Sequence, residues 1–237
     1  MSTLHNRAYY DAFSEGYDTR RGGGYHALLD ELEANLVLRH ARGGDVLEAG
    51  CGTGLILERL RGVCRSVVGV DLSMGMLGHA HARGLNVVQA NILEIPFKDA
   101  SFDAVCCFKV LAHVERIDEA LAELGRLVRP GGVLIAEFYN PFSIRGLMWN
   151  LKRPGKVALG LHEKNVYVRF DSPAQAQRRL PPNFSVVDER GVRVLTVLPQ
   201  AHRIPVMGTA LGMLERAAAD PLARLGSFYS VVARRQS

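Results

Sequence analysis

The chain has 237 residues, of which 48% are apolar, and a formal net charge of +5. This is enough apolar material for a sizeable core, and the composition excludes a disordered chain. The sequence has no run of about 18 apolar residues and no apolar N-terminal stretch, so we expect neither a membrane-spanning helix nor a signal peptide. Cys51, Cys64, Cys106 and Cys107 have the spacing of neither a metal site nor a disulfide framework. We therefore expect a reducing, cytoplasmic location and a single domain over residues 1–237.

The charge is unevenly distributed along the chain. Residues 1–140 carry 14 Lys and Arg against 18 Asp and Glu, a net charge of −4, whereas residues 141–237 carry 15 against 6, a net charge of +9. A basic second part is compatible with an anionic small molecule, an acidic membrane surface or a nucleic acid, and equally with a solvated basic face that has no partner. The charge alone does not choose among these.

Residues 25–139 alternate between helical and extended periods, which is typical of a parallel sheet with crossover helices. Apolar residues at helical spacing predict a helix from Tyr25 to about Leu36. Short apolar runs predict strands at 45–49, 66–71, 86–90 and 102–107, and a fifth strand from Val133. Further helices are expected after the glycines that follow the first strand, after Ser73 as N-cap, and over 117–128, where Pro130-Gly131-Gly132 follows.

The pattern is less regular after Asn140-Pro141. Ser172-Pro173-Ala174-Gln175 has the sequence of a capping box and predicts the start of a helix. We expect extended segments at 186–188 and 192–195, a helix over 204–219 and a last strand over 228–233. Within the single domain, we expect a cap helix in residues 1–24, a core in 25–139, a substrate-side insertion or lid in 140–182, and the C-terminal strands and helix in 183–237.

The most informative segment is Val46-Leu47-Glu48-Ala49-Gly50-Cys51-Gly52-Thr53-Gly54. A glycine-rich turn between a strand and a helix lets a ligand approach the backbone at the carboxyl edge of a parallel sheet. Its G-x-G-x-G spacing differs from the dinucleotide pattern G-x-G-x-x-G, and no lysine follows as in a phosphate-binding loop. Glu48 precedes the turn, and Asp71 ends the next strand, at a distance that suits a carboxylate accepting hydrogen bonds from ribose hydroxyls. Two carboxylates also suit a ligand that carries an ammonium and a sulfonium, although Glu48 has the alternative of being an ordinary strand-end acid.

This segment resembles motif I of the class I methyltransferases that depend on S-adenosylmethionine (SAM), and Asp71 falls where their ribose-binding acid lies. The similarity continues in order through Asn91-Ile92, Phe97, Ser101-Phe102-Asp103-Ala104, Leu111-Ala112-His113-Val114 and Leu127-Val128-Arg129-Pro130-Gly131-Gly132. It covers about residues 25–139 and is closest in kind to the ubiquinone- and menaquinone-biosynthesis branch, which includes many small-molecule methyltransferases. The resemblance implies a Rossmann-like, doubly wound, mostly parallel α/β sheet of seven strands. The last hairpin of that sheet would be antiparallel, with an insertion after the fifth strand.

The resemblance also implies SAM as cofactor, with S-adenosylhomocysteine as product, and assigns residues to it. The methionine end would be lined by Glu48, Gly50, Cys51 and Gly52, with Cys51 as a small filler and not a nucleophile. Asp71 would hold the ribose. The adenine would lie near Leu72, Met76, Asn91 and Ile92, with Ile92 presenting its backbone N–H. Asn91 stands where the family usually has Asp, and its amide oxygen still accepts a hydrogen bond.

Two aromatic residues complete the expected cofactor site. Phe108 would present a backbone carbonyl to the methionine part, and Tyr17 would cover the cofactor from the N-terminal segment. Tyr9, Tyr10 and Phe13 belong to the same aromatic segment, for which ordinary packing of a terminal helix is the alternative.

His113, just after the fourth strand, is the best-placed general base if the methylated atom belongs to a hydroxyl or an amine. A structural or substrate-positioning histidine is the alternative. Methyl transfer from a sulfonium is an in-line displacement, in which the protein mainly aligns the reactants and excludes water. We expect no metal site.

Substrate specificity is expected in residues 139–182, where apolar and basic side chains are mixed. They are Phe142, Ile144, Leu147, Met148, Trp149 and Leu151 with Arg145, Lys152, Arg153 and Lys156. This segment is interpreted as a lid over an apolar, anionic substrate, as an amphipathic segment on an acidic membrane surface, or as an insertion packed on the sheet edge. Arg169, Arg178 and Arg179 are candidates to clamp a carboxylate or phosphate.

The sequence thus predicts SAM-dependent methyl transfer to a small-molecule or lipid-like, anionic acceptor. An RNA methyltransferase that uses the basic C-terminal part is the alternative, although no recognisable RNA-binding module accompanies the core. A nicotinamide-dependent oxidoreductase is disfavoured by the glycine spacing, and a non-catalytic sensor or scaffold stays open. The sequence does not indicate the methylated atom, the acceptor or the oligomeric state.

Overall fold

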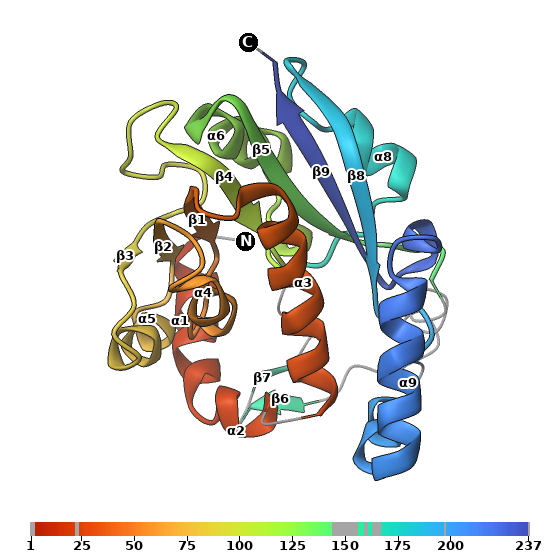
Figure 1. The fold of residues 1–237 in the computed structure, drawn as a ribbon. Helices are drawn as coiled ribbons and strands as arrows, with labels where there is room; N and C mark the ends of the chain where they lie inside the picture. Colours follow the sequence, from red (N-terminus) through yellow and green to blue (C-terminus); the bar gives the residue numbers. More distant parts are fainter. Residues whose placement is uncertain are drawn as a thin grey trace.

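A seven-stranded sheet with the strand order β3-β2-β1-β4-β5-β9-β8 forms the centre of the molecule (Figure 1). The computed structural model describes residues 3–21, 24–143, 156–158, 161–162, 167–196 and 198–236. The strands are β1 (Asp45–Ala49), β2 (Ser66–Asp71), β3 (Val87–Gln89), β4 (Phe102–Cys107), β5 (Val128–Tyr139), β8 (Phe184–Val192) and β9 (Phe228–Arg235). β1 to β5 pair in parallel, and β9 is antiparallel to both β5 and β8. The predicted doubly wound sheet with an antiparallel last hairpin is therefore confirmed.

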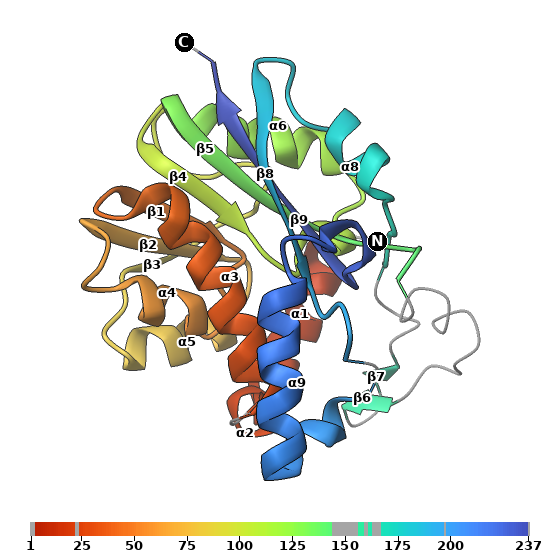
Figure 2. The ribbon, with the colours of Figure 1, turned by 45° about the vertical axis from the view of Figure 1, so that its right-hand side comes forward.

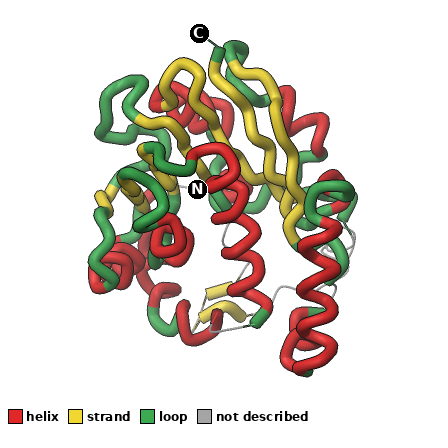
Figure 3. Tube along the Cα trace, viewed as in Figure 1, coloured by secondary structure: helices red, strands yellow, loops and turns green. Residues whose placement is uncertain are grey.

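Helices cover both faces of this sheet, as Figure 3 shows in red around the yellow strands. One face packs against α3 (Tyr25–Ala41), α4 (Leu55–Leu60) and α5 (Met74–Ala82). The other face packs against α6 (Ile117–Leu127) and α8 (Pro173–Arg178). Because side chains alternate along a strand, Cys106 joins the first core and Cys107 the second. The two faces thus form two apolar cores on either side of one sheet.

Elements outside these two layers close one end of the molecule and one flank. The N-terminal segment forms α1 (Thr3–Ser14), which contacts α5, and α2 (Tyr17–Arg21). On the flank, α9 (Pro205–Ala218) lies beside α3 (Figure 2). Short elements complete the described chain: β6 (Lys156–Ala158), β7 (Leu161–His162), and the 3-10 turns η1 (Leu111–His113), η3 (Pro199–Arg203) and η4 (Ala223–Leu225). No helix among the described residues is long and apolar enough to cross a membrane.

Two predicted strand boundaries are wrong, for local backbone reasons. β5 starts at Val128 and not at Val133, because the Pro130-Gly131-Gly132 segment stays within the strand as an irregularity in its pairing with β4. The expected segment at 192–195 is not a strand, because β8 ends at Val192. Arg193, which follows, has a φ of 59°, and this left-handed conformation ends the extended run. The predicted capping box is present: Ser172 Oγ accepts from the Gln175 backbone, and Gln175 caps in return.

Candidate functional site

A cavity of about 500 Å³ lies at the carboxyl ends of β1, β2 and β4, where parallel sheets of this kind bind ligands. Every cofactor-binding and catalytic residue predicted from the sequence lines it: Tyr17, Glu48, Gly50, Cys51, Gly52, Asp71, Leu72, Met76, Asn91, Ile92, Phe108 and His113. The fold therefore brings together residues from the N-terminal segment, three strand ends and the turn after β4. What each residue does there remains a prediction.

The glycine turn between β1 and α4 exposes bare backbone to this cavity. Gly50 and Gly52 have φ values of 77° and 54°, in the left-handed region that favours glycine. A Cβ on Gly50 would lie 2.2 Å from Val110 Cγ2, whereas a Cβ on Gly52 would have nothing within 4 Å. Gly50 is thus required by its packing against the turn after β4, and Gly52 leaves space in the cavity itself.

Asp71 holds the glycine turn in place as well as lining the cavity. Its Oδ2 accepts a hydrogen bond from the Gly52 backbone N–H at 2.9 Å, and its Oδ1 accepts from the Ser73 N–H at 2.9 Å. Burial raises the pKa of Asp71 although both hydrogen bonds favour the carboxylate. Since each carboxylate oxygen can accept a second hydrogen bond, this bracing leaves Asp71 able to bind hydroxyls of a ligand.

Glu48 is a buried carboxyl that lines the cavity. It is 3% exposed, and its Oε2 has no hydrogen-bond partner within the described parts of the chain. Burial raises its pKa well above the ordinary value. A buried polar atom without a partner is costly unless a ligand satisfies it, so Glu48 fits a ligand with a cationic N–H donor. Beside it, burial also raises the pKa of the Cys51 thiol, which agrees with Cys51 being a filler.

The predicted adenine end of the cavity is more constrained than the sequence indicated. Met76 is buried and Leu72 is half-buried. The Asn91 Oδ1 already accepts a hydrogen bond from the Leu93 N–H at 3.1 Å, which shapes the turn after β3. Only the second lone pair of this oxygen is therefore available to a ligand, and the Asn91 amide group has a structural role that was not predicted.

The N-terminal segment closes the cavity with an aromatic stripe. Tyr9, Tyr10, Phe13 and Tyr17 all line the cavity, and the rings of Tyr9 and Phe13 stack with centroids 5.8 Å apart. Two carboxylates fasten this segment to the core. The fastening contacts are Ser73 Oγ to Asp11 Oδ1 at 2.6 Å, Gly75 N to Asp11 Oδ1 at 3.0 Å, Thr53 Oγ1 to Asp18 Oδ1 at 2.7 Å and Arg83 Nη2 to Asp18 Oδ2 at 2.7 Å. Residues 3–21 thus cover the glycine turn and the start of α5.

A buried cluster of charged groups lies at the deep side of the cavity and was not predicted. Lys109 Nζ is 2.6 Å from Glu33 Oε1 and 3.6 Å from Asp30 Oδ1, and Arg21 pairs with Asp30. Glu33 is fully buried. One signal was present in the sequence: Glu33 is four residues after Leu29 and three before Leu36, and therefore shares the helix face that the apolar periodicity assigns to the core.

The same cluster includes Glu137 on β5. The Lys109 backbone N–H donates to Glu137 Oε1 at 3.2 Å, and Ser230 Oγ donates to Glu137 Oε2 at 3.2 Å. Burial raises the pKa of Glu137 to about 8. Lys109 has a φ of 59°, an uncommon conformation for a residue other than glycine, and such residues concentrate at functional sites.

His113 lines the cavity from the turn after β4, whereas the predicted adenine residues follow β2 and β3, on the other side of β1 in the sheet. Its Nδ1 is 2.9 Å from the Tyr167 carbonyl oxygen, and its Nε2 is 3.4 Å from the Tyr139 hydroxyl. Because a carbonyl only accepts, Nδ1 carries the proton and donates it, which leaves the lone pair of the neutral ring on Nε2. Tyr139 also lines the cavity. This arrangement presents a basic nitrogen and a phenol at one place.

The three arginines that are candidates to clamp an anion lie in different surroundings, and none of them lines the cavity. Arg179 pairs with Asp171 and Asp118 at 2.8 and 2.7 Å, and Arg178 is exposed. Arg169 hydrogen-bonds the Tyr167 hydroxyl, and its Nη1 is buried without a hydrogen-bond partner among the described residues. The anion clamp stays a prediction. The predicted lid residues Ile144, Arg145, Leu147, Met148, Trp149, Leu151, Lys152 and Arg153 lie outside the described residues, as does the side chain of Lys156. No group of three or more His, Cys, Asp or Glu that could hold a metal occurs in the described part of the chain.

Comparison with known protein families identifies the core of this fold. The family model of the methyltransferase domain matches residues 47–136, which run from β1 to β5 and include the glycine turn, Asp71 and His113. A protein of Mycolicibacterium smegmatis, whose name assigns it SAM-dependent methyl transfer, is 37% identical over 100 residues, 41% of this chain and 39% of that protein. The malonyl-[acyl-carrier protein] O-methyltransferase of Erwinia pyrifoliae is 34% identical over 148 residues, 60% of this chain and 55% of that enzyme. The matches thus span about half the length of these relatives or less.

Solved structures share the fold over nearly the whole chain. A SAM-dependent methyltransferase from Thermotoga maritima superposes with a TM-score of 0.67 at 20% identity, covering 95% of this chain and 99% of that one. The [4+2]-cyclase SpnF superposes with the same TM-score at 18% identity, covering 100% of this chain and 97% of that one. At such identities the likeness shows the fold alone, and the second name shows that this fold carries more than one reaction.

Proposed function

We propose that the chain is a class I SAM-dependent methyltransferase that transfers a methyl group from SAM to a small-molecule or lipid-like acceptor. The observation that carries this proposal is the division of the cavity into two chemically different ends. One end combines the glycine turn with Asp71 and Glu48, and the other combines His113 with Tyr139. A cofactor at the first end leaves the second end for an acceptor.

The residues at the first end fit SAM. The carboxyl of Glu48, which has no partner on Oε2 among the described residues, suits the ammonium of the methionine part. Asp71 suits the ribose hydroxyls, and the bare backbone of Gly50 and Gly52 admits the ligand close to the turn. A volume of about 500 Å³ lies within the range of small-molecule sites. We assign Leu72, Met76, Asn91, Ile92, Cys51, Phe108 and Tyr17 to the same cofactor.

When bound, SAM supplies an electrophilic methyl group. The part of the protein is to align the acceptor, which is worth about 7–11 kcal/mol when the geometry is good, and to exclude water. The aromatic stripe of residues 9–17 would do the latter. We propose that His113 Nε2 takes the proton of an acceptor O–H or N–H, while the hydrogen bond from Nδ1 to the Tyr167 carbonyl fixes the ring.

The charges that line the cavity bear on the acceptor. Its three cations already have acidic partners: Arg21 pairs with Asp30, Lys109 with Glu33, and Arg116 with Glu119. This argues against the anionic acceptor that the overall charge suggested. We propose an acceptor that presents a neutral hydroxyl or amine near His113. Oxygen is our first choice, because the relative from Erwinia pyrifoliae is named an O-methyltransferase.

The RNA methyltransferase alternative receives little support from the basic C-terminal part. Four of its arginines pair with acids of the same chain: Arg179 with Asp118 and Asp171, Arg190 with Asp220, Arg216 with Glu31, and Arg224 with Glu189. Arg234 and Arg235 donate to backbone carbonyls. Phosphate binding by these groups would compete with contacts that they already make.

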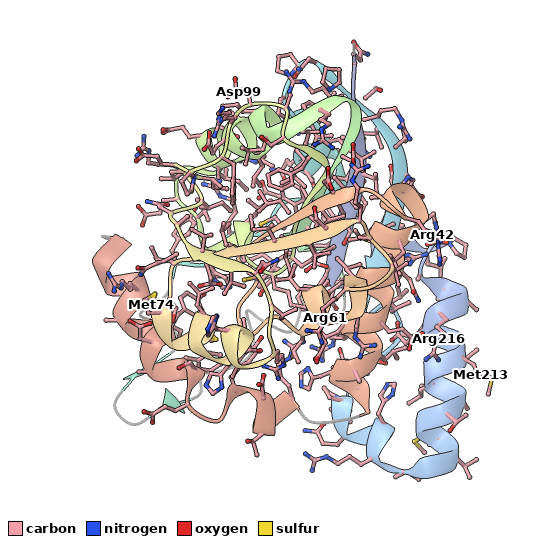
Figure 4. The ribbon with its side chains drawn as sticks, turned by 60° about the vertical axis from the view of Figure 1, so that its left-hand side comes forward. Arg42, Arg61, Met74, Asp99, Met213 and Arg216 are labelled. Atoms are coloured by element: carbon pink, nitrogen blue, oxygen red, sulfur yellow. The ribbon has the colours of Figure 1, made fainter. Side chains whose placement is uncertain are left out.

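Calorimetry with SAM and with S-adenosylhomocysteine tests the cofactor assignment. We expect both to bind, NADH not to compete, and Asp71→Ala to abolish binding. Asp99→Ala is the matched control, because Asp99 (labelled in Figure 4) is exposed and is not among the residues that line the cavity. Since Asp71 also braces the turn, an analogue without ribose hydroxyls separates the two roles: it should bind the wild type weakly and lose less affinity than SAM does in Asp71→Ala. The cofactor assignment would be wrong if neither SAM nor S-adenosylhomocysteine bound the wild type and Asp71→Ala therefore changed nothing.

Transfer of a radiolabelled methyl group tests the catalytic end. The acceptors are a set of phenols, long-chain alcohols and primary amines, offered with labelled SAM to the wild type and to His113→Gln. We expect the variant to bind SAM normally and to transfer about 10²–10⁴ times more slowly, without the pH dependence that a histidine base imposes. Equal rates in both proteins would contradict the role of His113. Transfer to none of these classes would favour a non-catalytic protein.

A further inference from the structure

The helix α9 has its large apolar side chains on the outside of the molecule. Val206 is 84% exposed, Met213 60% and Leu214 54%, and Ile204 and Met207 are also exposed. The residues of α9 that are buried are Gly212, Glu215 and Ala218. An ordinary surface helix shows the opposite pattern, with apolar residues towards the core and polar residues towards water. The name apolar face is used below for Ile204, Val206, Met207, Met213 and Leu214.

Polar contacts hold α9 in this orientation. Glu215 is fully buried and accepts hydrogen bonds from the Val194 N–H at 2.9 Å and the Leu195 N–H at 3.0 Å. Arg216 makes a two-pronged pair with Glu31 of α3, with both distances 2.8 Å. Gly212 faces Leu28 of α3, where a Cβ would be 3.9 Å from the leucine. Small residues and anchored charges thus fix the inner side of α9, and the apolar face stays turned outward.

Within the stretch that carries the apolar face the exposed charged side chains are basic, and one of them, Arg216, is balanced by Glu31 of α3. Between Arg193 and Ala217 the sequence has one acidic residue, Glu215, and that residue is buried. The exposed charges of this stretch are Arg203 and Arg216. Leu198, which is also exposed, extends the apolar surface beside Arg203. Apolar side chains flanked by cations match the boundary between acyl chains and anionic headgroups.

A second copy of the chain matches this face less well. A symmetric dimer brings the same surface patch of both copies together. Such a dimer would place Arg203 of both copies in one interface, where residues 193–217 offer no exposed acid to balance the charge. A lipid surface with acidic headgroups supplies that balance.

The position of α9 fits delivery of a lipid-like acceptor. Figures 1 and 2 both place the N-terminal end of α9 at the end of the molecule where α2 lies. The α2 residues Tyr17 and Arg21 line the cavity. We propose that the apolar face of α9 binds an anionic membrane surface, with its apolar side chains at the acyl boundary and Arg203 at the headgroups. The sequence pattern places a membrane contact in residues 140–182. The proposal assigns the membrane contact to α9 instead.

Cosedimentation of the full chain with vesicles tests this proposal. We expect binding to vesicles of phosphatidylcholine with phosphatidylglycerol and weaker binding to phosphatidylcholine alone. Val206→Gln with Met213→Gln should lower the bound fraction at least about tenfold, and Arg203→Gln by about threefold to tenfold. Met74→Gln is the matched control, because Met74 is 51% exposed and lies on the opposite side of the molecule from Met213 (Figure 4). All variants change exposed side chains, and circular dichroism checks that they fold.

Three results would overturn the proposal. These are no binding of the wild type to either vesicle, equal loss in Met74→Gln and in the α9 variant, and a wild-type dimer in sedimentation that the α9 variant dissolves. The last result would assign the apolar face to a second copy. Because this assay needs neither SAM nor an acceptor, its failure is separate from a failure of the proposed methyl transfer.

Discussion

Replacing Gly50 with alanine tests whether the turn after β1 must have a bare backbone. Gly50 has a φ of 77°, and a Cβ at this position would lie 2.2 Å from Val110 Cγ2, against an ordinary contact of at least 3.4 Å. The left-handed conformation costs a residue other than glycine about 1–2 kcal/mol. Displacing Val110 by more than an ångström adds about 1–3 kcal/mol, as overpacking generally does. We expect Gly50→Ala to lower the free energy of unfolding by about 2–5 kcal/mol.

Gly52→Ala is the matched comparison for this experiment. Gly52 also has a positive φ, of 54°, but a Cβ there would have nothing within 4 Å. It should therefore lose only the conformational part, about 1–2 kcal/mol. Because Gly52 lines the cavity, its new methyl group should weaken SAM binding strongly although the protein remains folded. Stability and affinity thus respond differently at two glycines of one turn.

The overlap with Val110 can be isolated by a double-mutant cycle. Val110→Ala alone should cost about 1–2 kcal/mol through lost burial, but in the Gly50→Ala background it removes the clash. Urea unfolding of the four proteins should give a favourable coupling of about 1–3 kcal/mol between the two changes. Equal stability of Gly50→Ala and Gly52→Ala, or no coupling with Val110→Ala, would refute the reasoning.

Three further results are expected. Burial raises the pKa of Glu48 and a bound ammonium would lower it again, so SAM binding should release protons. In Glu48→Gln, calorimetry in buffers of different ionisation enthalpy should find less release, with affinity about 10- to 100-fold weaker. Glu137 keeps its proton up to about pH 8 in the folded protein, whereas the unfolded chain loses it near about pH 4.3, so the free energy of unfolding should fall as pH rises between these values. Glu137→Gln should show a slope shallower by up to about 1.4 kcal/mol per pH unit in urea unfolding. Asp18→Ala removes the partner of Thr53 and Arg83, so stopped-flow release of SAM should be about five- to thirtyfold faster, and an unchanged rate would show that α2 does not limit release.

The cofactor end could be predicted because its residues are constrained locally. The turn needs glycine at position 50 for reasons of backbone and packing, and Asp71 must end the strand next to β1 for its carboxylate to reach the Gly52 N–H. Such requirements leave fixed spacings in the sequence. The second role of Asp71, as the acceptor that holds the turn in place, could not be predicted separately. The same carboxylate at the same position serves both the turn and the proposed ribose contact.

The acceptor end could not be predicted beyond His113. Tyr139 and Tyr167 reach His113 from 26 and 54 residues away, and neither position follows from a local pattern. The pairing of Lys109 with Glu33 joins the turn after β4 to the middle of α3. The overall charge was misleading for the same reason: most of the described arginines after Tyr139 make contacts that only the fold reveals.

The buried cluster around Lys109 links the two ends of the cavity through one backbone position. Lys109 holds Glu33 of α3 with its ammonium and Glu137 of β5 with its backbone N–H, and it makes both contacts in a left-handed conformation. The next residue, Val110, is the one that a Cβ on Gly50 would strike. A change at Lys109 would therefore displace the turn that carries His113 and, through Val110, the glycine turn of the cofactor end. Whatever aromatic and apolar side chains line the acceptor end, Lys109 couples the conformation of the acceptor end to that of the cofactor end.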